Sequence, residues 1–86
     1  MSKIESAIER MRRRPQNVPY KELRLICEYY FGPPRQKGTS HRIYQTGIPE
    51  NPRVNIQNDR GKAKAYQVRQ VIAVIKQLEN DNGHEE

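Results

Sequence analysis

Two consecutive prolines, Pro33 and Pro34, limit what the middle of this chain can form. Proline has no backbone N–H to donate, so it rarely continues a helix or a central strand. The apolar run before the pair must therefore end near Phe31-Gly32. Any strand at residues 34–38 must be short and lie at the edge of a sheet.

Helical periodicity predicts three helices around this break. The first covers residues 2–14, where a thin apolar stripe indicates that it packs weakly or serves as an arm. The second begins at Asn17-Val18-Pro19 and the third covers residues 65–79. Their apolar faces contain Tyr20, Leu23, Ile26, Cys27 and Tyr30 in the second helix, and Val68, Val71, Ile72, Ile75 and Leu78 in the third.

Residues 39–46 and 53–58 predict a hairpin, because Ile43 and Tyr44 have high β-propensity in the first segment and Val54 and Ile56 alternate with polar residues in the second. The connection, residues 47–52, is rich in turn-forming residues and is expected to be mobile. The expected class is α+β, with a three-stranded antiparallel sheet covered by helices on one face. The α-β-β-β-α portion is the order of a double-stranded-RNA-binding domain (dsRBD), preceded here by an extra N-terminal helix.

The chain of 86 residues suits one folded domain. We expect an N-terminal helical extension at 1–16, a dsRBD-like domain at 17–79 and a disordered acidic tail at 80–86. The last eight residues hold four of the ten acids and none of the 16 basic residues. Residues 1–78 therefore carry 16 basic against six acidic residues, a net charge of +10 that suits a polyanion partner or simply a solvated basic surface.

Cysteine content and hydropathy narrow the class of protein further. Cys27 is the only cysteine, which leaves no intramolecular disulfide and no cysteine-based metal site, and its apolar surroundings indicate a buried core residue. No segment resembles a signal peptide or a membrane span. We expect a cytoplasmic protein without a membrane partner or a cofactor.

The stretch from Arg35 to Tyr44 carries the main candidate chemistry, because it places His41 among cations. Imidazole exchanges protons near neutral pH, and cations stabilise a phosphodiester as its charge develops. RNA supplies its own nucleophile, the 2′-hydroxyl, so one proton-transfer group and positive charge are the minimum requirement. Lys37 and Arg42 are candidates for that charge, and Gly38 and Ser40 for backbone N–H and hydroxyl donors to the same phosphate.

The alternation of side chains along a strand determines on which face of the sheet His41 lies. On a regular strand His41 shares a face with Ile43, while Arg42 shares one with Tyr44. If the Ile43 face is the core, His41 must lie at its rim. From the residues alone, a structural or solvent-exposed role for His41 stays open. No obvious second proton-transfer group accompanies it.

Lys62 and Lys64 form a second cationic cluster, just before the predicted last helix. A helix N-terminus attracts phosphate, and lysines there add charge, so these residues are candidate RNA contacts or, alternatively, solubilising lysines in a loop. No His, Asp or Glu pair has metal-ligand spacing, so no metal site is expected.

Several segments together resemble a known family. Gly38-Thr39-Ser40-His41-Arg42-Ile43-Tyr44 is similar to the glycine-serine-histidine strand of HicA-type toxins, which are small bacterial mRNA interferases. Asn55-Ile56-Gln57 and the segment from Gly61 to Gln70 resemble the last strand and last helix of one subgroup. A weaker match is Asn17-Val18-Pro19-Tyr20. The resemblance covers about residues 17–79.

This resemblance implies a dsRBD-like fold, ribonuclease activity on mRNA with His41 as the catalytic histidine, and a cognate HicB-type antitoxin as protein partner. The expected function is therefore a metal-independent endoribonuclease, the toxin of a type II toxin–antitoxin system. A non-catalytic RNA-binding module of the same fold and a purely protein-interaction domain are the alternatives.

Overall fold

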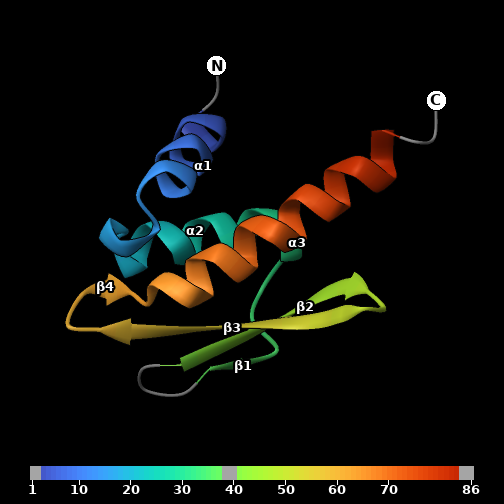
Figure 1. The fold of residues 1–86 in the computed structure, drawn as a ribbon. Helices are drawn as coiled ribbons and strands as arrows, with labels where there is room; N and C mark the ends of the chain where they lie inside the picture. The colour runs from blue at the N-terminus through green and yellow to red at the C-terminus, as the bar shows by residue number, and fades with distance from the viewer. Residues whose placement is uncertain (1–2, 38–40, 84–86) are drawn as a thin grey trace.

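A computed structural model describes residues 3–37 and 41–83, of which residues 36, 37 and 81–83 are described for the backbone alone. The protein is an α+β domain, as predicted (Figure 1). The elements in chain order are α1 (Lys3–Arg13), a 3-10 turn η1 (Pro15–Asn17), α2 (Tyr20–Phe31), β1 (Gln36–Lys37), β2 (His41–Ile48), β3 (Asn51–Asp59), β4 (Lys62–Ala63) and α3 (Ala65–Gly83).

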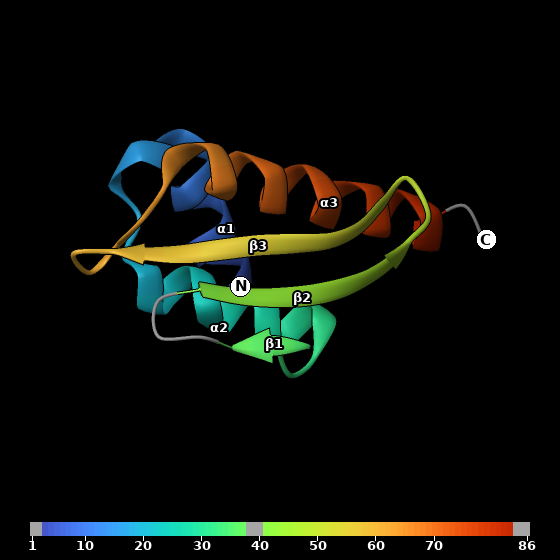
Figure 2. The same cartoon turned by 90° about the horizontal axis from the view of Figure 1, so that it is seen from below.

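The strands form one antiparallel sheet in the order β1-β2-β3-β4. Within residues 3–37 and 41–83, all three helices lie on one face of the sheet and none lies on the other face (Figures 1 and 2). The sheet has one strand more than predicted, because Lys62 and Ala63 pair back onto Asp59 and Asn58. As the two prolines required, β1 is a two-residue strand at the edge.

The core lies between the sheet and the helices. Five residues of the two long strands are buried and alternate with exposed ones: Tyr44, Thr46 and Ile48 of β2, and Val54 and Ile56 of β3. They meet the buried helical residues Leu23, Ile26 and Cys27 of α2 and Val68, Val71, Val74 and Ile75 of α3. Burial also raises the pKa of the Cys27 thiol, which confirms a core residue rather than a nucleophile.

The expected weak packing of the first helix is wrong. Ala7 and Met11 of α1 are buried in the common core, and Met11 has no exposed surface. Arg10 of α1 also forms an ion pair with Glu22 of α2, at 2.7 Å. The stripe is thin but sufficient, because it fits between α2 and α3. Residues 3–13 therefore pack as part of the domain.

Two further predicted boundaries are wrong. The helix α3 continues to Gly83, so residues 80–83 are helical rather than part of a disordered tail. The hairpin connection is the two-residue turn Pro49-Glu50, not a long mobile loop. A bulge before it, with Gly47 at φ 80°, is braced by Thr46, whose hydroxyl accepts the Ile48 N–H at 3.1 Å and donates to the Asn51 carbonyl. β2 therefore ends two residues later than predicted, at Ile48, and β3 begins two residues earlier, at Asn51.

Candidate nucleic-acid interface

His41 is the first residue of β2 and is exposed to solvent. The buried residues of this strand are the even-numbered ones from Tyr44 onward, so the Tyr44 face is the core. Since side chains alternate along a strand, His41 belongs to the opposite, helix-free face. Its backbone partner on β3 is Gln57. The imidazole is thus on an open surface rather than at the rim of the core.

The same helix-free face carries a set of polar side chains, which we call the polar ladder: Gln45 on β2, and Arg53, Asn55 and Gln57 on β3. Gln57 is half-buried and the other three are exposed. Within the described ranges 3–37 and 41–83, none of these four side chains makes a hydrogen bond or ion pair. Neither β2 nor β3 contains an acid before Asp59, so the ladder has no negative charge.

Arg42 lies on the other face and does not join His41. Its Nε donates to the Tyr20 hydroxyl at 3.1 Å, and its Nη1 is 3.9 Å from a carboxylate oxygen of Glu28. Only 25% of its side chain is exposed. The expectation that Arg42 supplies charge beside His41 is therefore not supported by the geometry, because alternation turns it toward α2.

Tyr44 is also directed away from His41. Its ring is fully buried, and its hydroxyl donates to Glu28 at 2.9 Å. Burial first, and then this carboxylate, raise the pKa of the Tyr44 hydroxyl. The hydroxyl stays protonated and ties β2 to α2, so Tyr44 is a structural residue and offers no second proton-transfer group to His41.

The β3–β4 connection forms a basic hairpin, defined here as residues 59–64 with the cations Arg60, Lys62 and Lys64. Asn58 accepts the Gly61 N–H at 2.7 Å and closes the turn, and Arg60 and Gly61 adopt positive φ. Lys62 is exposed, whereas Lys64 is half-buried and lies 4.0 Å from Asp59. An open hollow runs from these residues to Tyr66, which is 63% exposed.

The basic hairpin and the start of β2, whose first residue is His41, are at the same end of the sheet (Figure 2). Asp59 follows Gln57, the partner of His41, by two residues, or about 7 Å along β3. The structure therefore places three of the predicted site residues at one end of the sheet: His41, Lys62 and Lys64. The backbone of Lys37 pairs with Arg42 next to them, but its side chain lies outside the described part of the chain, as do Gly38 and Ser40.

Sequence reasoning missed four residues of this region: Arg53, Asn55, Gln57 and Arg60. The first three alternate with Val54 and Ile56, so the pattern that identified the core strand also defined its other face. Arg60 lies in a segment that the sequence marks only as a turn. Arg60 becomes one of the cations at this end of the sheet because β4 folds back beside β3.

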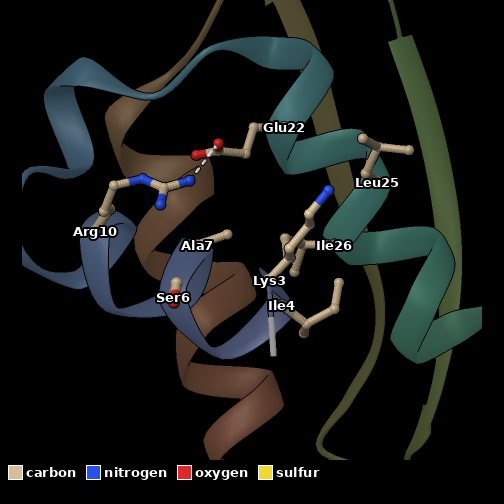
Figure 3. A pocket seen from close by; sticks show the side chains of 8 residues that line it. All are labelled: Lys3, Ile4, Ser6, Ala7, Arg10, Glu22, Leu25 and Ile26. Carbon is tan, nitrogen blue, oxygen red and sulfur yellow. Dashed lines mark hydrogen bonds and ion pairs between the residues drawn. The ribbon is translucent and has the colours of Figure 1, made fainter. Parts of the chain in front are cut away.

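A separate groove lies in the helix layer, between α1 and α2 (Figure 3). It has a volume of about 430 Å³, and the Arg10–Glu22 ion pair crosses its rim. Ile4, Ala7, Leu25 and Ile26 give it apolar walls. The groove is on the helix side of the sheet and is not part of the His41 site.

Neither a metal-binding cluster nor a membrane-spanning helix occurs in the described part of the chain. Among the side chains that the structure describes, no three of His, Cys, Asp or Glu gather closely enough to hold a metal ion. Over residues 3–37 and 41–83, no helix is both long enough and apolar enough to cross a membrane. Comparisons with protein-family models, curated proteins and solved structures found no match.

Proposed function

We propose that the protein is a metal-independent endoribonuclease that cleaves mRNA, with His41 as its proton-transfer residue. The observation that carries this proposal is the exposed imidazole next to an acid-free polar ladder, at the same end of the sheet as the cations of the basic hairpin. Positive charge there attracts the RNA backbone and stabilises the negative charge that develops on the phosphate. The dsRBD-like order of elements proposed for residues 17–79 is compatible with this use.

The proposed chemistry uses the nucleophile that RNA carries. His41 accepts the proton of a 2′-hydroxyl as its oxygen attacks the adjacent phosphorus. The bond from phosphorus to the 5′-oxygen breaks, and that oxygen takes a proton from water. The products are a 2′,3′-cyclic phosphate and a 5′-hydroxyl end. General-base catalysis of this kind contributes about 10²–10⁴-fold, so we expect a modest enzyme.

We further propose that the protein is the cytoplasmic toxin of a bacterial type II toxin–antitoxin system, in line with its resemblance to HicA-type toxins. A HicB-type antitoxin would then cover the His41 face. An acidic partner surface would complement the basic hairpin and the +10 charge of residues 1–78.

Induction in bacteria tests this proposal. Wild type should arrest growth and fragment cellular mRNA, whereas His41→Ala at equal expression should do neither. Co-expression of the product of an adjacent antitoxin-like reading frame should restore growth to wild-type cells. Arrest by both variants alike, or by neither, would refute the proposal.

One observation favours a second candidate, a non-catalytic RNA-binding module. Between His41 and Arg53, the polar side chains on His41's face of β2 and β3 are amides and one arginine, which do not act as acids or bases near neutral pH, and the carboxylate of Asp59 lies beyond Gln57. Under this alternative both wild type and His41→Ala bind RNA and neither cleaves it.

A further inference from the structure

We infer that the helix-free face of the sheet binds a short single-stranded segment of RNA, which runs from His41 along the polar ladder to Arg53. This inference rests on the proposed function and specifies the form of its substrate. Four side chains would hold the strand: Gln57 and Asn55 next to the reacting phosphate, and Gln45 and Arg53 farther along.

The register of β2 and β3 places these side chains in rows. His41 pairs with Gln57, Ile43 with Asn55 and Gln45 with Arg53. Side chains on one face repeat every second residue, so consecutive rows are about 7 Å apart and the three rows span about 13 Å. Such a track is short and straight, and it accommodates only a few nucleotides beside the imidazole.

The chemistry of the ladder fits unpaired bases. Each side-chain amide offers both donors and an acceptor, and the amides of Gln45, Asn55 and Gln57 have no partner within the described part of the chain. Base edges present the complementary groups, and in RNA they are accessible to a protein mainly where the strand is unpaired. Arg53 adds one cation for a phosphate at the far end of the track.

The composition of the face argues against a protein occupant. Apolar area drives most protein association. Here Ile43 is the one large apolar side chain at the alternating positions of this face in residues 41–48 and 51–59, and it is half-buried already. A solvated face of no function normally mixes both charge signs. The one acid at an alternating position of this face, Asp59, lies beyond the His41–Gln57 row, so the track from Gln57 to Arg53 carries no acid, which suits a polyanion.

The test measures RNA affinity in the His41→Ala background, so that cleavage does not interfere. The probes are a fluorescent 12-nucleotide unstructured RNA and the same sequence as a 12-base-pair duplex. The variants are Asn55→Ala and Arg53→Ala. The matched control is Arg12→Ala, which removes the same charge from α1, in the helix layer on the other side of the molecule (Figure 1).

We expect Asn55→Ala to weaken single-strand binding about 2- to 12-fold, the equivalent of one hydrogen bond, with an unchanged salt dependence. Arg53→Ala should weaken it and also reduce the slope of log K against log salt by about 0.7, the value for one phosphate contact on a single strand. Neither variant should change duplex affinity, and the control should behave as the parent.

Several results would overturn the inference. These are equal weakening of single strand and duplex, equal effects in Arg12→Ala and Arg53→Ala, or no effect of Asn55→Ala and Arg53→Ala. Loss of self-association in these two variants, without a change in RNA affinity, would instead identify a protein interface. Cleavage by the wild-type protein is scored separately, so the inference can fail while the proposed ribonuclease activity stands.

Discussion

Replacement of Met11 by alanine tests whether the N-terminal helix is part of the folding unit. Met11 is fully buried among α1, α2 and α3. Removing a buried methionine side chain typically costs about 2–5 kcal/mol, because transfer energy is lost and a cavity remains. A domain of this length has a total stability of about 4–13 kcal/mol, so the substitution removes a large fraction of it.

The assay is thermal and urea unfolding followed by circular dichroism. For domains of 60–100 residues, each 1 kcal/mol shifts the melting temperature by about 4–8 °C, so Met11→Ala should melt at least 8 °C below wild type. The control is the neighbouring exposed residue, in the variant Arg12→Ala, which should stay within about 0.5 kcal/mol of wild type. If both variants melt together, α1 is an arm and the packing described above is wrong.

Three other predictions follow from specific contacts. Tyr44→Phe removes the hydrogen bond to Glu28, so it should lower the free energy of unfolding, measured by urea titration, by about 1.5–3 kcal/mol. RNA cleavage should be unchanged. A cleavage defect without a stability defect would contradict the structural role of Tyr44. Asp59→Asn should strengthen RNA binding and steepen its salt dependence, because Lys64 loses its nearby carboxylate. Unchanged affinity in a filter-binding assay would show that Lys64 does not contact RNA. The contribution of Tyr30 to stability should be lost between about pH 10 and 12, because burial and Glu79 raise the pKa of Tyr30 to about 12. A group with a raised pKa stabilises the fold only while it stays protonated. Tyr30→Phe should reduce this alkaline loss in urea midpoints measured at pH 8 and 11, and an identical loss would refute the assignment.

Much of the fold is encoded in local patterns that the sequence shows directly. The pair Pro33-Pro34 predicts a short edge strand, and the helical spacing of Leu23, Ile26 and Cys27 predicts a buried face of α2. These features depend on backbone chemistry and periodicity, which act within a few residues. Such features need no knowledge of the partner elements.

The misjudged features depend on contacts between distant segments. Met11 is buried because α2 and α3 leave a space that its thin stripe fills, and β4 exists because Lys62 and Ala63 meet the end of β3. Whether the Ile43 face or the Tyr44 face of β2 is buried likewise depends on α2, where Glu28 accepts a hydrogen bond from the Tyr44 hydroxyl. That choice separated His41 from Arg42, and no property of either residue reveals it.

The central claim is that His41 performs proton transfer on bound RNA. The most direct measurement is a single-turnover assay with a long mRNA and EDTA, comparing purified wild type with His41→Ala at matched RNA occupancy. The account predicts fragments with 5′-hydroxyl ends from wild type and a cleavage rate at least about 10²-fold lower from the variant, with similar RNA affinity. Equal cleavage by the two proteins, or intact RNA with both, would contradict it.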